Sequence, residues 1–196
     1  MPRQSRAEAT RARLLDATVE ALAECGYRGT STQEVCRRAG VSRGTLLHHF
    51  PTRIELLVAS LDAILSDRVD GFMASRRGQE RVDPGVLVRE LWAQWSGPVY
   101  VAWLELAVAA RTEPELRGPM QEVMDRFDIE VVTGFQELVD TSHLSPELAL
   151  ILPMLTFAMF NGLAVGRGYG TDAYEEPVIA LIENLARLLP AAGGVL

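Results

Sequence analysis

Apolar residues recur along most of the chain at the three- and four-residue spacing of helices, and the alternation typical of half-buried strands is nearly absent. The first stripe predicts a helix from about Ser5 to Gly26, beginning at a capping box at residues 5–8. A second capping box, at residues 52–55, begins another stripe that runs to Val69. The positions expected on the buried face of the first helix are Leu14, Leu15, Thr18, Val19, Leu22 and Cys25.

Prolines near the expected helix starts divide the rest of the chain. Pro84, Pro114 and Pro146 each stand directly before a helical pattern and within two positions of a residue that can cap it. Thr32 and Ser42 can each cap a short helix, at residues 32–40 and 42–50. With these two helices the pattern predicts about nine helices with short connections, which is an all-α fold. We expect a three-helix first domain at residues 1–52. The second domain, at residues 53–196, should contain a linking helix followed by a five-helix body.

The two short helices have the residues that a helix-turn-helix requires. Cys36 is small enough to stand where the helices touch, and Gly40 can adopt the positive φ of the turn. The polar residues Arg43, Thr45, His48 and His49 fall on the exposed side of the second helix. The simpler alternative is an ordinary helical corner. The apolar residues expected between the helices are Val35, Ala39, Val41 and Leu46.

Charge is divided unevenly between the two ends of the chain. The formal net charge of −7 over 196 residues argues on its own against nucleic acid as a partner. Residues 1–53, however, hold nine arginines and five acids, whereas residues 54–196 hold ten arginines and 21 acids. The sequence thus places a basic head before an acidic body. Two cysteines and the absence of a signal-peptide pattern favour a reducing cytoplasm.

The chain resembles the tetracycline-repressor (TetR) family of bacterial transcription regulators. The resemblance lies in Gly26-Tyr27, in Thr30-Ser31-Thr32, and in the run Ala-Gly-Val-Ser-Arg-Gly-Thr-Leu-Leu-His-His-Phe at residues 39–50. It implies a homodimer of helical subunits whose N-terminal heads bind operator DNA. It also implies that the bodies hold a small-molecule pocket and the dimer interface, so that a ligand relieves repression by shifting the linking helix.

The same resemblance assigns roles to residues of the head. Arg43, Gly44 and Thr45 would face base edges, and Gln33 would reach a base from the preceding helix. Leu47 stands where the family commonly has tyrosine, and it can pack on a thymine methyl group but cannot donate a hydrogen bond. The positions that match phosphate-binding residues of the family are Thr32, His48, His49 and Arg53.

Large aromatic residues gather in four apolar stretches of the body. They could simply pack the core, or they could line a cavity for a neutral, largely hydrophobic effector, with Trp92, Tyr100 and Asn161 as polar contacts. The aromatic residues of these stretches are Trp92, Trp95, Tyr100, Trp103, Phe127, Phe157 and Phe160. The candidate set for the ligand is Trp92, Tyr100, Trp103, Phe127, Phe157, Phe160 and Asn161.

The last two helices are the candidates for the dimer interface. The penultimate helix is apolar on every side, more than one core requires, and the last has an apolar stripe. Two such helices from each subunit would form a four-helix interface with two-fold symmetry. The stripe consists of Val178, Leu181, Ile182, Leu185 and Leu189.

Other functions have weaker support in the sequence. We find no nucleophile elbow, phosphate loop or metal-ligand spacing, so we expect no catalysis, metal or cofactor. An all-α enzyme, or an interaction protein that retains the head without binding DNA specifically, remains the alternative. Residues 148–165 are apolar enough to approach a membrane span, but Pro153 and Gly162 interrupt them and we expect no membrane association. Cys25 and Cys36 could form a redox pair or could simply be small apolar residues.

Overall fold

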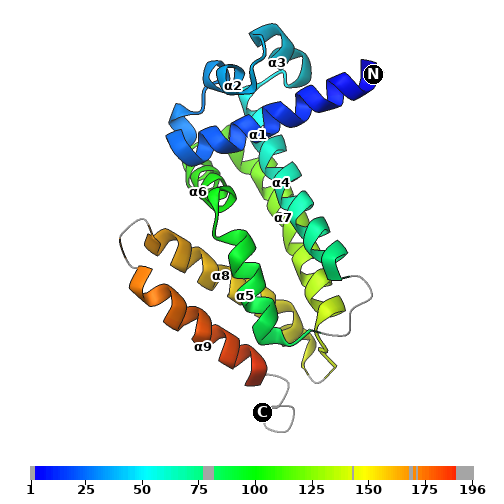
Figure 1. Ribbon diagram of the computed structural model, residues 1–196, viewed down its shortest axis with the longest axis vertical. Helices are drawn as coiled ribbons and strands as arrows, with labels where there is room; N and C mark the ends of the chain where they lie inside the picture. The colour runs from blue at the N-terminus through cyan, green and yellow to red at the C-terminus, as the bar shows by residue number, and fades with distance from the viewer. Residues whose placement is uncertain (1–2, 77–81, 143, 168–169, 171, 189–196) are drawn as a thin grey trace. The chain divides into compact units, whose positions relative to one another are not determined.

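The computed structural model describes residues 3–76, 82–142, 144–167, 170 and 172–188 (Figure 1). These residues form nine α-helices and one short 3-10 helix, and none of them lies in a strand, so the predicted all-α fold is confirmed. The helices are α1 (Arg3–Gly29), α2 (Thr32–Ala39), α3 (Arg43–His49), α4 (Arg53–Arg76), α5 (Pro84–Trp95), α6 (Pro98–Ala110), α7 (Pro114–Leu138), α8 (Pro146–Arg167) and α9 (Glu175–Leu188), with the 3-10 helix η1 at Asp172–Tyr174.

The helices pack as two compact units. The first unit comprises residues 1–67 and 98–126, and the second comprises residues 68–97 and 127–196. The predicted domain boundary between residues 52 and 53 therefore does not coincide with the division by packing. The beginning of α4, all of α6 and the first half of α7 pack with the N-terminal helices. That boundary stays a prediction about function.

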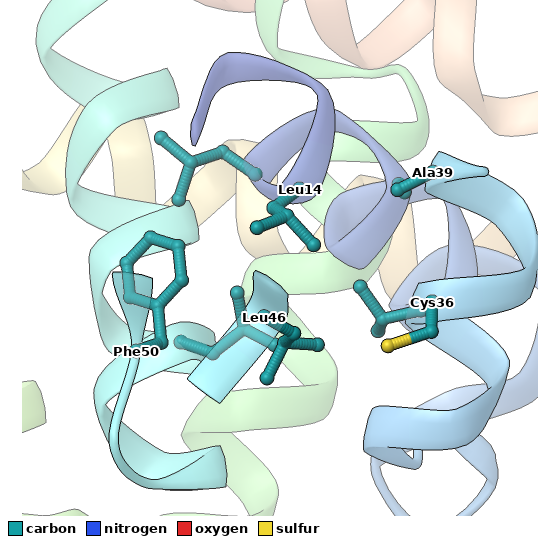
Figure 2. Packing of buried hydrophobic residues seen from close by; sticks show 9 residues of the cluster. Leu14, Cys36, Ala39, Leu46 and Phe50 are labelled. Atoms are coloured by element: carbon teal, nitrogen blue, oxygen red, sulfur yellow. The ribbon is translucent and has the colours of Figure 1, made fainter. Parts of the chain in front are cut away.

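The core of the first unit brings together α1, α2, α3 and the start of α4. Figure 2 shows Leu14 of α1 facing Cys36 and Ala39 of α2 and Leu46 of α3, with Phe50 beside them. Leu14 and Leu46 have no exposed surface. Both were expected on buried faces because of their helical spacing, and the prediction for these two positions is confirmed.

Local hydrogen bonds set the ends of these short helices. Ser42 caps α3 as expected, and its Oγ accepts from the backbone N–H of Thr45 at 3.1 Å. Thr52 caps the start of α4 as expected, since its hydroxyl accepts from the N–H of Glu55, and the same hydroxyl donates to the Glu55 carboxylate. The cap of α2 is Ser31, one residue before α2 begins at Thr32. The chain is already helical at Arg3, two residues before the expected start of α1.

The second unit is built around α5. In it Val88 and Trp92 of α5 pack with Phe160 of α8 and with Ile179 and Ile182 of α9. Both α8 and α9 pack against α5 (Figure 1). A neighbouring cluster joins the second half of α4 to α5 and to the end of α7, through Phe72, Leu87 and Val139. Members of both clusters, among them Val88, Ile182, Phe72 and Leu87, line the pocket described below.

Candidate nucleic-acid interface and ligand pocket

The turn between α2 and α3 depends on Gly40. Its φ of 65° and ψ of 38° lie in the left-handed region, where a side chain is disfavoured. The N–H of Val41 donates to the Cys36 carbonyl at 3.1 Å, which closes the turn. The chain can then enter α3 at once through the Ser42 cap. The predicted helix-turn-helix is confirmed by this geometry and by the fold.

The outer face of α3 carries the residues expected to meet DNA. Leu46 holds the helix to the core, while Arg43, Gly44, Leu47 and His48 are exposed. Thr45 and His49 are partly buried on the same short helix. Within the part of the chain that the structure describes, no carboxylate forms an ion pair with Arg43. This helix therefore presents a guanidinium that no acidic side chain neutralises.

On α2 the positive charge is largely neutralised within the head. Glu34 pairs with Arg37 at 2.6 Å and with Arg38 at 2.7 Å, and these two guanidinium groups hold the pKa of Glu34 down to about 2. Arg38 also pairs with Glu24 at 2.8 Å. Gln33 is exposed on the same helix, and Thr32 is partly buried at its first turn. The uncharged residues of α2 are thus better placed for DNA than its arginines.

Arg53, expected to bind phosphate, is engaged inside the head. Its guanidinium lies 4.3 Å above the ring of Tyr27 and donates to the backbone carbonyls of Tyr27 and Thr30, the latter at 2.8 Å. The start of α4 is thereby fastened to the end of α1. Nothing local to Arg53 in the sequence indicates these bonds, because their partners lie 23 and 26 positions earlier.

The second unit contains a mostly apolar pocket of about 150 Å³. Five helices contribute to its walls: the second half of α4, α5, the second half of α7, α8 and α9. Phe72, Leu91, Trp95, Phe135 and Phe157 are among the side chains that line it. Its polar lining side chains are Arg68, Glu130 and Thr156. Such a cavity suits a small, mainly hydrophobic molecule.

Of the residues predicted to bind the ligand, Phe157 lines this pocket. Phe127 stands behind it, with ring centres 5.5 Å from Phe157 and 5.0 Å from Trp95. The rings of Trp92 and Phe160 pack against each other in the adjoining core, tilted by 49° with their centres 5.3 Å apart. Asn161 is partly buried without lining the pocket.

The polar contacts expected for the ligand are also placed elsewhere. The indole N–H of Trp92 donates to Glu175 at 2.9 Å. Tyr100 and Trp103 belong to the first unit, where their rings lie 5.5 Å apart and burial raises the pKa of Tyr100 to about 12.

The sequence did not single out Arg68 as a lining residue, and Trp95, one of the aromatic residues of the four apolar stretches, lines the pocket although it was left out of the candidate set. Trp95 stands three positions after Trp92, and Arg68 stands one turn before Phe72 on the same side of α4. That spacing was the available signal for both of them.

A broad apolar surface lies on α8 and α9. In the most apolar 18-residue window of α8, with a mean hydropathy of 2.0, only 17% is buried, and by length and composition this helix could cross a membrane. Among the predicted dimer residues, Leu181 and Leu185 are half exposed, Val178 is partly buried and Ile182 belongs to the subunit's own core. Leu189 lies outside the described residues. The exposed apolar side chains of α8 include Leu150, Ile151 and Leu155.

The two cysteines differ in their surroundings. Cys25 is exposed, so its predicted place on the buried face of α1 is wrong. Cys36 is buried where α2 packs on α1, and burial raises the pKa of its thiol. A buried, protonated thiol reacts slowly, which favours the interpretation of Cys36 as a packing residue. No cluster of potential metal ligands occurs among the residues described by the structure.

A capped helix-turn-helix on an all-helical body defines a DNA-binding transcriptional regulator. Residues 14–59 match the sequence profile of the bacterial regulatory proteins of the tetR family. The chain is 32% identical over 179 residues to the HTH-type transcriptional regulator BetI of Paraburkholderia phytofirmans. The aligned region covers 88% of this chain and 91% of that protein. The chain therefore belongs to the TetR family.

Solved structures share the fold. A putative TetR-family regulator from Rhodococcus sp. matches with a TM-score of 0.72 and 26% identity, over 90% of this chain and 95% of that one. The regulator FadR from Bacillus subtilis, solved in complex with stearoyl-CoA, matches with a TM-score of 0.69 and 16% identity, over 93% of this chain and 98% of that one. These relatives are described as transcriptional regulators and not as enzymes, and none supports the alternative of an enzyme or a simple interaction protein.

Proposed function

We propose that the protein is a cytoplasmic, homodimeric repressor that binds a palindromic operator and is released by a small hydrophobic molecule. The observation that carries the proposal is the outer face of α3. The helix is capped by Ser42 and anchored by Leu46, and Arg43 at its start is exposed with no ion pair to a described carboxylate. A short helix of this kind fits the major groove of DNA, where its first residues reach base edges.

Each residue of the head has a part in this proposal. The guanidinium of Arg43 suits the O6 and N7 acceptors of guanine, and Leu47 suits a thymine methyl group. Gly44 and Thr45 would lie close to the base edges, with Gln33 reaching a base from α2. Thr32, His48 and His49 would contact phosphates, which fix the register of the helix on the duplex. Arg53 would act mainly by fastening α4 to α1, because its guanidinium already has three contacts within the head.

Dimerisation would supply the second recognition helix. Two heads separated by about one turn of DNA, ~34 Å, match the two halves of a palindrome. The support is the apolar surface on α8 and α9, which a single subunit leaves in contact with water. We assign the interface to that surface, with Leu181 and Leu185 among its members.

Ligand release is supported by the pocket in the second unit. The relative in complex with stearoyl-CoA holds a largely apolar acyl chain, and the pocket described here has a similarly apolar wall. The helix α4 begins in the core of the head at Leu56 and ends at the pocket wall with Phe72 and Met73. A ligand that favours another position of α4 would change how the heads are presented to DNA.

The test is binding to the DNA beside the protein's own gene, followed by an arginine comparison. Arg43→Ala should weaken binding to the identified operator roughly 5- to 150-fold, equivalent to about 1–3 kcal/mol, and should change binding to random DNA much less. Arg37→Ala is the control, because Arg37 is an exposed arginine of the same head whose charge is already paired with Glu34. Equal losses on operator and random DNA for Arg43→Ala would refute its role in base recognition.

A further inference from the structure

Arg68 is an unusual member of an apolar wall. It lies on α4, one helical turn before Phe72, and both side chains line the pocket of the second unit. Arginine normally keeps its charged end in water, yet this side chain is only partly exposed. Burial lowers the pKa of Arg68. The guanidinium is still cationic at neutral pH, so it places a positive charge at this point of the pocket wall.

The hydrogen bonding of Arg68 leaves most of its donors available. One Nη atom donates to the backbone carbonyl of Gln94, near the end of α5. A guanidinium has five N–H donors, and within the described ranges no carboxylate forms an ion pair with this one. A cation in an apolar environment without a counter-charge is costly unless an anion joins it.

The other two polar side chains of the pocket do not compete for this role. The Thr156 hydroxyl donates to the Leu152 carbonyl at 3.0 Å, within α8, so its proton is already used. Glu130 is an acceptor and has an interaction of its own. Arg68 is therefore the polar lining side chain whose donors can meet an acceptor on a bound molecule.

We propose that the effector is an amphipathic carboxylate, whose apolar body fills the pocket while its carboxylate pairs with Arg68. The inference rests on the proposed function, since it specifies the ligand of the same pocket. A planar carboxylate matches the guanidinium fork in a bidentate pair, which is stronger and more directional than a bond to a neutral oxygen. The neutral effector expected from the sequence is replaced by a monoanion.

The experiment compares three probes with the same eight-carbon tail and different ends: octanoate, octanamide and octylammonium. Binding to the wild-type protein is measured at neutral pH through tryptophan fluorescence, because the Trp95 side chain lines the pocket. Thermal stabilisation by each probe provides a second readout. Octanoate should bind at least about tenfold more tightly than octanamide, because its charge-assisted bonds to Arg68 are stronger than neutral ones.

Variants of Arg68 separate its charge from its structural bond to Gln94. Arg68→Gln keeps an N–H donor for that carbonyl but loses the charge, and Arg68→Met keeps only the apolar stem. Both should lose the preference for octanoate, so that octanoate binds no more tightly than octanamide, and Arg68→Lys should retain part of the preference. Arg117→Met is the matched control, because Arg117 also donates to carbonyls at a helix end, those of Ala110 and Arg111, but does not line the pocket.

The outcomes distinguish this inference from the function on which it rests. Equal binding of octanoate and octanamide to the wild type, or a preference that survives in Arg68→Gln, overturns the carboxylate assignment and leaves the pocket intact. Tightest binding of octylammonium also overturns it and transfers the role to Glu130. If none of the three probes binds the wild type, the apolar pocket itself fails as an effector site, and the proposed ligand release fails with it.

Discussion

Gly26 has a backbone conformation that other residues rarely adopt. Its φ of 70° and ψ of 177° lie in a region that is almost exclusive to glycine, and it is the point where α1 departs from helical geometry. The residue that follows, Tyr27, donates its N–H to Glu105 of α6 at 2.8 Å. A Cβ atom added to Gly26 would lie 2.9 Å from an oxygen of that same carboxylate. The corner that joins α1 to α6 therefore requires a glycine.

Gly26→Ala should destabilise the protein by about 1–3 kcal/mol from backbone strain alone, and further if Glu105 must move. Urea unfolding followed by far-ultraviolet circular dichroism measures the change. The control is Gly71→Ala, on an exposed position of α4 where an added Cβ meets nothing within 4 Å. Alanine is the better helix former, so that variant should be unchanged or more stable by up to about 1 kcal/mol. Similar unfolding midpoints for the two variants would contradict the role given to Gly26.

At the scale of the elements, α3 shows how seven residues are held as a helix. A helix this short has little stability of its own in water. Ser42 satisfies donors at its first turn, and the fully buried Leu46 attaches it to α1 and α2. The cap and the buried residue hold α3 in place, so its outward-facing residues are not needed for its stability and are available for recognition.

The apolar surface of α8 and α9 predicts how the subunits associate. Ile151→Glu combined with Leu181→Glu should yield monomers that bind the operator poorly, because two charges would be buried against a partner. Both residues are 54% exposed in the subunit and neither lines the pocket, so the fold should tolerate the change. Sedimentation equilibrium at micromolar concentration measures the association.

Val108→Glu is the control for that experiment. Val108 is 55% exposed, like the two test positions, but lies on α6 in the first unit. The dimer should survive this change. If the wild type itself sediments as a monomer at micromolar concentration, or if the double variant remains dimeric, the assignment of the interface to α8 and α9 is wrong.

The sequence predicted features that depend on neighbouring residues. The Thr52 cap, the Ser42 cap and the left-handed Gly40 involve atoms at most a few positions apart, so their patterns are visible in the chain itself. Capping by Ser31 and not Thr32 shows the usual error of one residue at a helix end.

Features that depend on distant contacts could not be predicted in the same way. The carboxylate that accepts from the Trp92 indole N–H is 83 positions away, and the carbonyls that accept from Arg53 are more than 20 positions away. The division into two units depends likewise on α6 packing against α1, which periodicity does not reveal. Aromatic content thus indicated an apolar body but did not show which rings line a cavity and which fill the core.

On the scale of the whole molecule, the charge asymmetry complements the proposed DNA binding. Residues 1–53 carry a formal net charge of +4 and residues 54–196 carry −11. DNA repels the acidic part and attracts the basic part, so an approaching molecule is turned with its head toward the duplex. The ion pairs of Glu34 with Arg37 and Arg38 reduce the free positive charge of the head, which leaves more of the attraction to exposed residues such as Arg43.

If the pocket is the effector site, binding of the effector and binding of the operator are thermodynamically coupled. If an effector weakens operator binding tenfold, thermodynamic linkage requires the operator to weaken effector binding tenfold as well, about 1.4 kcal/mol in each direction. Octanoate serves as the effector, with affinities for the operator measured at saturating octanoate and affinities for octanoate measured at saturating operator. The two factors should agree for the wild type. In Arg68→Gln the octanoate affinity should fall, while operator binding without octanoate stays unchanged because Arg68 lies outside the head. If the pocket binds octanoate without any change in operator affinity, the cavity is not an effector site. A ligand with equal affinity for two conformations does not shift the equilibrium between them.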